Sequence, residues 1–333
     1  MKPAAYIKSY EELYNQINER LKVMRKPSRE CFRDFMIRKL SYVYRAVTEE
    51  LENLSKVLSD VESAGDFYKE LFQVFTGYEA GSLAAKAKKY ARVARNIYYE
   101  ALGEFRRLSE DNGVGSSELF KRNAGRLLSL YKRLSRKVLL VKKYLVEVSK
   151  MPDVRGDYVV VIAGLPQVGK STLLSKLTRA KPEIGNYPFT TKTLIAGHLE
   201  VDGFGKIVLL DSPGMLDSPI EEKNLIELKA VLAIKHLANH LLYVFAVYPH
   251  FYYTLEEQVR VFSQVTKLLE GKPVTVVLNK VDLLGLDQAE KVARVIKEYT
   301  GFEPLPVSAL TGYNLELLKK VLIGAFMAGK KSQ

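Results

Sequence analysis

The residues from Gly164 to Ser171, with the sequence Gly-Leu-Pro-Gln-Val-Gly-Lys-Ser, have the types and spacing that bind a polyphosphate. The two glycines let the backbone approach phosphate oxygens closely, and Lys170 can reach the β- and γ-phosphates. The hydroxyl of Ser171 is placed to bind Mg²⁺. The predicted phosphate-binding residues are Gly164, Leu165, Pro166, Gln167, Val168, Gly169, Lys170, Ser171 and Thr172.

A second motif, Asn279-Lys280-Val281-Asp282, follows the strand-like run 273–278 and indicates which base is bound. The carboxylate of Asp282 can accept hydrogen bonds from guanine N1–H and the N2 amine, two donors that adenine lacks on that edge. An unpaired buried carboxylate would disfavour adenine by roughly 10⁴-fold. We expect Asn279 to brace neighbouring loops and Lys280 to lie along the base through its methylene stem. Taken alone, the motif is also compatible with a polar strand end.

Three further segments complete the predicted nucleotide site. Asp211 ends the apolar run 206–211 and is expected to hold Mg²⁺ through water, and Gly214 can bring its N–H close to the γ-phosphate. In the segment 187–192, a threonine hydroxyl is expected to close over the metal when the γ-phosphate is present, although a solvated loop hydroxyl is the alternative. A backbone N–H of the segment Ser308, Ala309 and Leu310 is expected to face guanine O6.

Met215 follows Gly214, at the position where many signalling GTPases carry the glutamine that orients the attacking water. A thioether cannot perform that task. The sequence therefore predicts slow intrinsic hydrolysis that depends on a group from another loop, an ion or a partner. Glu221 and Glu222 are nearby, but we expect both to begin a helix.

The elements that position these motifs are predicted from apolar runs. Residues 158–163 are expected to form a buried parallel strand before the phosphate loop, and residues 171–177 a helix after it. This order directs several backbone N–H groups and the positive end of a helix dipole at one point. Residues 304–307 are expected to form a further strand.

The front of the chain has a different character. The length of 333 residues predicts about two domains. Residues 1–150 contain 30 Lys and Arg residues against 19 Asp and Glu, a net charge of +11, whereas the remaining residues contain 21 against 19. Segregated basic charge indicates an anionic macromolecule as the partner of the front half.

Helical periodicity dominates that half. Apolar residues at three- and four-residue steps from Leu127 to Leu145 predict one helix, and the glycine-containing segments 64–65 and 112–115 are expected to separate the helices of an antiparallel bundle. Basic rows on these helices favour RNA as the partner. A solvated helix face and an anionic membrane surface are the alternatives. The candidate RNA-binding residues are Lys88, Arg92, Arg95, Arg122, Arg126, Arg133 and Lys137.

Other residue types narrow the class of protein. The single cysteine, Cys31, cannot form an internal disulfide and fits a reducing cytoplasm. No run approaches ~18 apolar residues, and the N-terminus does not resemble a signal peptide, so we expect a cytoplasmic protein. His236 and His240 are spaced as on one helix face, but no third metal ligand is evident.

The motifs together resemble a known family. Gly164 to Ser171, the segment Tyr-Pro-Phe-Thr-Thr-Lys at 187–192 and Asp-Ser-Pro-Gly-Met-Leu-Asp at 211–217 are similar to the Obg–HflX superfamily of translation GTPases. Residues 219–227 and the basic front half most resemble the nucleolar GTP-binding protein type. The resemblance implies an α/β P-loop G domain with a mixed, mainly parallel sheet, preceded by an all-α helical bundle.

The same resemblance implies roles for particular residues. Thr191 would be the metal-contacting threonine, so the implied Mg²⁺ set is Ser171, Thr191 and Asp211, and the implied catalytic set is Lys170, Thr191 and Gly214. Gln167 stands where the superfamily usually has an asparagine that helps to bind potassium, which leaves potassium stimulation open. The chain ends soon after the G domain, so it resembles the shorter archaeal form.

We therefore expect a basic helical bundle over 1–150, a linker over 151–157 and a GTP-binding domain over 158–330. The expected function is that of a GTPase assembly factor for the large ribosomal subunit, which binds GTP and GDP, docks on rRNA and ribosomal precursor particles, and requires Mg²⁺. An RNA-binding scaffold that uses GTP as a structural ligand is the alternative. A G protein that binds anionic lipid through its bundle is a third reading.

Overall fold

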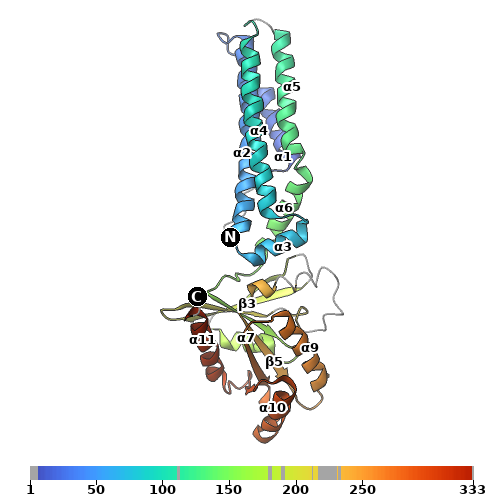
Figure 1. The fold of residues 1–333 in the computed structure, drawn as a ribbon, viewed down its shortest axis with the longest axis vertical. Helices are drawn as coiled ribbons and strands as arrows, with labels where there is room; N and C mark the ends of the chain where they lie inside the picture. Colours follow the sequence, from blue (N-terminus) through green and yellow to red (C-terminus); the bar gives the residue numbers. More distant parts are fainter. Residues whose placement is uncertain are drawn as a thin grey trace. The chain divides into compact units, whose positions relative to one another are not determined.

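The computed structural model describes residues 7–110, 113–178, 182–188, 192–211, 213–216, 231 and 234–331. The chain forms two compact units, Met1–Ser149 and Lys150–Gln333 (Figure 1). The first unit is helical, and the second is an α/β unit built on one sheet. The expected fold class, a helical region followed by an α/β domain with a mixed, mainly parallel sheet, is confirmed.

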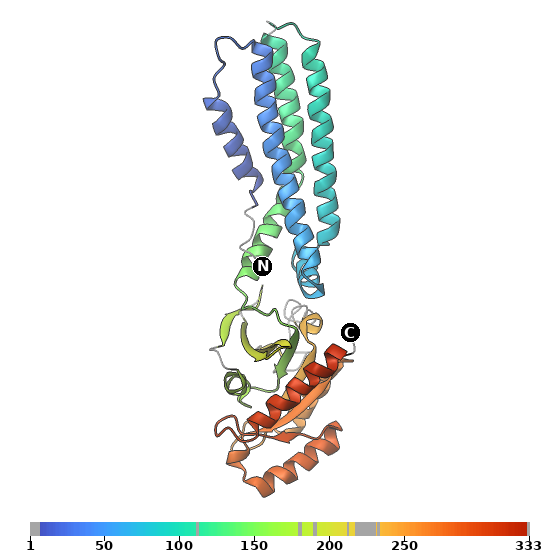
Figure 2. The ribbon, with the colours of Figure 1, turned by 90° about the vertical axis from the view of Figure 1, so that its left-hand side faces the viewer.

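In the first unit, three long helices, α2, α4 and α5, pack along one another (Figure 2). The described helices of this unit are α1 (Tyr10–Val23), α2 (Phe32–Ser63), α3 (Asp66–Thr76), α4 (Ala80–Arg106), α5 (Gly113–Lys132) and α6 (Ser135–Ser149). Helix α1 begins at a capping box, in which Ser9 accepts a hydrogen bond from the backbone of Glu12 and Glu12 accepts one from the backbone of Ser9. Helix α3 ends at Gly77, whose φ of 73° is readily adopted by glycine.

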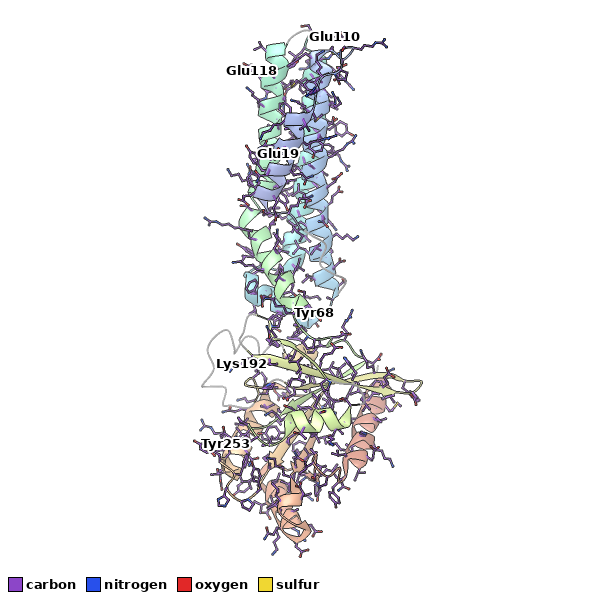
Figure 3. The ribbon with its side chains drawn as sticks, turned by 180° about the vertical axis from the view of Figure 1, so that it is seen from behind. Glu19, Tyr68, Glu110, Glu118, Lys192 and Tyr253 are labelled. Carbon is purple, nitrogen blue, oxygen red and sulfur yellow. The ribbon has the colours of Figure 1, made fainter. Side chains whose placement is uncertain are left out.

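Two tyrosines help to fill the core of the helical unit. Tyr131 and Tyr144 are fully buried. Their hydroxyls donate to backbone carbonyl oxygens, Tyr131 to Lys8 at 2.6 Å and Tyr144 to Tyr68 at 3.0 Å (Tyr68 is labelled in Figure 3). Burial raises the pKa of both phenols. Each ring therefore contributes apolar area while its hydroxyl remains hydrogen-bonded.

The prediction of one continuous helix through 127–145 was wrong. The chain turns at residues 133–134, between α5 and α6, where the Leu134 N–H donates to the carbonyl of Tyr131 only three residues earlier. Tyr131, Leu134 and Val138 are all buried across this turn. The apolar spacing is thus preserved through the break, which explains why periodicity did not reveal it.

The expected loop at residues 112–115 also differs from the structure. Helix α5 already begins at Gly113, so the glycines at 113 and 115 lie in its first turn. Glycine costs roughly 0.5–1 kcal/mol relative to alanine in the middle of a helix, but these two glycines lie at the start of α5.

The sheet of the second unit has the strand order β2-β3-β4-β1-β5-β6-β7. Its strands are β1 (Tyr158–Ala163), β2 (Glu183–Asn186), β3 (Thr193–Val201), β4 (Gly205–Asp211), β5 (His240–Ala246), β6 (Val274–Asn279) and β7 (Leu305–Pro306). β2 pairs with β3 and β3 with β4 in antiparallel fashion, and the other neighbours are parallel. The carboxyl ends of β1, β4, β5 and β6 therefore meet at one edge, where open α/β sheets bind ligands.

Helices cover the sheet. The described helices of this unit are α7 (Lys170–Leu177), α9 (Leu255–Leu268), α10 (Leu286–Thr300) and α11 (Leu315–Lys331), with a 3₁₀ turn, η2, at Val281–Leu283. Helix α7 packs with α11, and α9 packs with α10. Every residue of β1 and β5 is buried, as expected for parallel strands with both faces covered. Among the helices of the described residues, none combines the length and apolar character that a bilayer crossing needs.

The assignment of His240 to a helix was wrong, because this residue begins β5. Its Nδ1 lies 3.1 Å from the hydroxyl of Tyr158, and its Nε2 lies 2.8 Å from the hydroxyl of Thr275. Burial lowers the pKa of His240 to about 4. The imidazole is thus a neutral, hydrogen-bonded part of the core at the amino end of the strands.

Candidate functional site

The phosphate loop connects β1 to α7 and is closely packed on both sides. A Cβ atom built on Gly164 (φ 141°) would lie 2.4 Å from the carbonyl oxygen of Val244. One built on Gly169 (φ 98°) would lie 2.4 Å from Nδ2 of Asn279. Both the backbone angles and these approaches require glycine at the two positions that the motif specifies.

Lys170 is buried, and its ammonium lies within the curve of this loop. Nζ donates to the carbonyl oxygens of Gly164 at 2.8 Å and of Leu165 at 3.0 Å. Gln167, at the tip, is exposed and has a left-handed backbone with φ of 64°. The loop therefore places a positive charge and the N-terminus of α7 at one point, which suits a polyphosphate.

Ser171 and Asp211 come together at the amino end of α7. The Ser171 hydroxyl donates to Oδ2 of Asp211 at 2.6 Å, and Asp211 is fully buried at the end of β4. A hydroxyl and a carboxylate that meet beside a phosphate loop are the oxygen ligands that Mg²⁺ takes in nucleotide sites. These two residues therefore fit the implied metal. Thr191, the third predicted ligand, lies outside the described residues.

Asn279, at the end of β6, joins two of the predicted loops. Its Nδ2 donates to the carbonyl oxygen of Val168 at 2.8 Å, and its Oδ1 accepts from the N–H of Ala309 at 3.0 Å. The Asn279 side chain is 1% exposed. One buried amide therefore ties the phosphate loop to the segment that follows β7.

The other predicted base-binding residues surround this link. Asp282 is exposed in η2. Ser308 is buried, and its Oγ accepts from the N–H of Thr311 at 3.1 Å. The N–H of Ala309 is engaged by Asn279, whereas Leu310 is 74% exposed. Carbonyl and amide hydrogen bonds thus hold this segment beside the end of β6.

Lys280 contacts Tyr248, a residue that the sequence motifs do not include. It has a left-handed backbone with φ of 63°, and its Nζ lies 4.2 Å from the ring centroid of Tyr248. Tyr248 follows β5 in a segment with several aromatic residues, of which Tyr253 is labelled in Figure 3. The sequence analysis missed Tyr248, because an aromatic residue after a buried strand carries no nucleotide motif.

The segment after β4 is described only in part. A Cβ atom on Gly214 (φ 78°) would lie 2.9 Å from Cδ and Nζ of Lys192, which is also labelled in Figure 3. The Met215 side chain is 1% exposed, and its thioether offers no strong hydrogen bond to a water. Glu221 and Glu222 lie outside the described residues.

The basic rows of the helical unit differ in their neighbours. Lys88, Arg92 and Arg95 are exposed along α4, and no ion pair with the described part of the chain involves them. On α5, by contrast, Arg122 pairs with Glu104 and Arg126 with Glu100, both glutamates being on α4.

Arg133 and Lys137 are the remaining two RNA-binding candidates. Arg133 is exposed between α5 and α6. Nζ of Lys137 lies 4.3 Å from the ring centroid of Tyr78. The row on α4 therefore presents the most available positive charge among the seven candidates.

Comparison with known proteins shows which families and relatives this chain is similar to. A family model described as a 50S ribosome-binding GTPase matches residues 159–280. An uncharacterized protein of Methanocaldococcus jannaschii is 35% identical over 237 residues, which are 70% of this chain and 65% of that protein. Nucleolar GTP-binding protein 1 of Drosophila melanogaster is 29% identical over 267 residues, which are 79% of this chain and 40% of that protein.

The chain matches only part of these relatives, and it can also be aligned with a solved structure. The chain spans about two thirds or less of the length of these relatives. A crystal structure of a nucleolar GTP-binding protein 1 from Plasmodium falciparum aligns with 53% of this chain and 89% of its own, at 23% identity and a TM-score of 0.43.

Proposed function

We propose that this chain is a P-loop GTPase of the nucleolar GTP-binding protein 1 type, which binds and hydrolyses GTP as an assembly factor for the large ribosomal subunit. The observation that carries the proposal is the double hydrogen bond of Asn279, which joins the phosphate loop to the segment after β7. This link makes the phosphate-binding and base-binding parts one preorganised site. The description of the family model, a 50S ribosome-binding GTPase, supports the ribosomal role.

In this proposal, Lys170 binds the β- and γ-phosphates, and Asp282 binds guanine through N1–H and N2. Ser171 and Asp211 would hold Mg²⁺, with Thr191 as the third residue. When bound, the ion would neutralise part of the negative charge of the phosphates. Gly214 would present its N–H to the γ-phosphate. The contact of 2.6 Å between Ser171 and Asp211 supports the metal assignment.

Hydrolysis is proposed to be slow in the isolated protein. The buried Met215 occupies the position from which a glutamine would orient water. We therefore expect purified ribosomal particles to stimulate turnover by supplying or ordering the missing group. Single-turnover hydrolysis with and without the particles measures this effect, and fast turnover of the protein alone would contradict it.

Docking on rRNA is proposed to occur through the helical unit. The net charge of +11 over residues 1–150 supports this step, as does the exposed row on α4, which forms no ion pair with the described residues. Each lysine or arginine that neutralises a phosphate steepens the salt dependence of binding. Exchange of Lys88, Arg92 and Arg95 for glutamine is therefore expected to weaken rRNA binding and flatten that dependence. Exchange of Arg122 and Arg126, which are already paired with glutamates, is the matched control and should have a smaller effect.

The whole proposal is tested by fractionating cell extract with a GTP analogue or with GDP. We expect the protein to move onto large subunits or their precursors with the analogue and to leave them with GDP, because GTP would favour the docked state. Equal distribution under both conditions would count decisively against an assembly GTPase.

A second candidate is an RNA-binding scaffold that keeps GTP as a structural ligand. The burial of Met215 favours it, because a site without a water-orienting side chain at this position can bind GTP without turning it over. The particle-stimulated assay separates the two functions. A scaffold would bind the particles and show no stimulation of hydrolysis.

A further inference from the structure

Tyr248 lies at the carboxyl end of the sheet, in the segment between β5 and α9. The start of this segment is fixed by Gln258 of α9, which is fully buried. Oε1 of Gln258 accepts from the N–H of Ala246 at 3.0 Å, and Nε2 donates to the carbonyl of Ala246 at 2.9 Å. The Tyr248 ring packs on Phe251 with a centroid distance of 4.7 Å. The backbone at the start of the segment and the Tyr248 ring therefore each have a fixed contact.

Lys280 extends from the base-recognition motif toward that ring. Its Cε lies 3.9 Å from the position that a Cβ atom on Gly169 would take, so its stem passes beside the phosphate loop. Its Nζ lies 4.2 Å from the Tyr248 centroid, within the range of a cation–π contact. Asn279, the preceding residue, is fixed by its two buried hydrogen bonds. Both ends of Lys280 are thus held in place.

We propose that Tyr248 is a positioning residue for guanine-nucleotide binding, which holds the Lys280 ammonium so that the methylene stem is preset as a surface for the base. This inference rests on the proposed function of the site. A free lysine side chain loses much rotamer freedom when a ligand orders it. A contact that orders Lys280 beforehand removes part of that cost, so it strengthens binding without touching the phosphates.

The test compares GDP and GTP affinities of wild type, Tyr248→Phe, Tyr248→Leu and Lys280→Met by calorimetry. Phenylalanine keeps the ring, so Tyr248→Phe should remain within about twofold of wild type. Tyr248→Leu should weaken GDP and GTP binding by the same factor, about twofold to thirtyfold. The turnover rate at saturating GTP should not change, because the chemistry occurs at the phosphates. In the Lys280→Met background, Tyr248→Leu should have no further effect on affinity.

Tyr252→Leu is the matched control, because Tyr252 is in the same segment and 82% exposed. Its affinities should equal those of wild type. Equal affinity of Tyr248→Leu and wild type, or full additivity of Tyr248→Leu and Lys280→Met, would overturn the inference. An equal loss of nucleotide affinity in Tyr248→Phe would also overturn the inference, because the effect would then come from the tyrosine hydroxyl and not from the ring. If wild type itself binds neither GDP nor GTP, the proposed function fails instead, so the two failures are distinguishable.

Discussion

Replacement of Asn279 by alanine tests the link between the phosphate loop and the segment after β7. The change removes two hydrogen bonds, of 2.8 Å to Val168 and 3.0 Å from Ala309. Both backbone groups belong to buried residues, and an unsatisfied buried group costs about 1–3 kcal/mol. We therefore expect the free energy of unfolding of the α/β unit to fall by about 2–6 kcal/mol. Circular dichroism during urea unfolding measures this loss.

The same variant should also bind guanine nucleotides less well, because the two loops are no longer fixed relative to each other. Asn239→Ala is the matched control. Oδ1 of Asn239 accepts from the N–H of Val159 at 2.8 Å, at the opposite end of the strands. It should lower stability while leaving GDP affinity unchanged, once both are measured well below the unfolding midpoint. If Asn279→Ala loses stability but binds GDP as tightly as wild type, the assigned role of Asn279 is refuted.

Three further predictions concern charge and protonation. Lys170→Ala should weaken GTP binding by tenfold or more, because a charge-assisted hydrogen bond is worth about 1.5–3 kcal/mol, and calorimetry showing unchanged affinity would remove Lys170 from the site. Asp282→Asn should shift preference from guanosine toward xanthosine nucleotides, and retained GTP selectivity in competition assays would contradict the base assignment. The folded-state pKa of His240, about 4, lies below the ordinary value of 6.5, so the unfolded chain binds the proton first as pH falls. As pH is lowered from 6.5 to 4, the free energy of unfolding of wild type should therefore fall by up to ~3 kcal/mol more than that of His240→Gln. Identical dependence of unfolding on pH in the two proteins would refute this prediction.

The sequence was most informative where chemistry restricts the residue type. The strand at 158–163 and the helix that follows it were predicted closely, because a buried parallel strand before a glycine loop has few alternatives. The strands ending at Asp211 and Asn279 were likewise found from apolar runs that finish in a polar residue. These motifs define the carboxyl edge of the sheet.

Other features depended on tertiary contacts that leave no local pattern. The turn between α5 and α6 preserves the apolar spacing, so periodicity predicted one helix. β5 was not predicted, because the four-residue spacing of His236 and His240 is typical of a helix. In the structure, the His240 ring instead forms hydrogen bonds with Tyr158 and Thr275 on neighbouring strands. Tyr248 was missed because its partner, Lys280, is distant in sequence.

The central claim is that one preorganised pocket selects guanine nucleotides. Calorimetric titration of the purified protein with GTP and with ATP, in the presence of Mg²⁺, tests it most directly. We predict tight binding of GTP and binding of ATP weaker by roughly 10⁴-fold, because adenine leaves the Asp282 carboxylate without its donors. Comparable affinities for the two nucleotides would contradict the account.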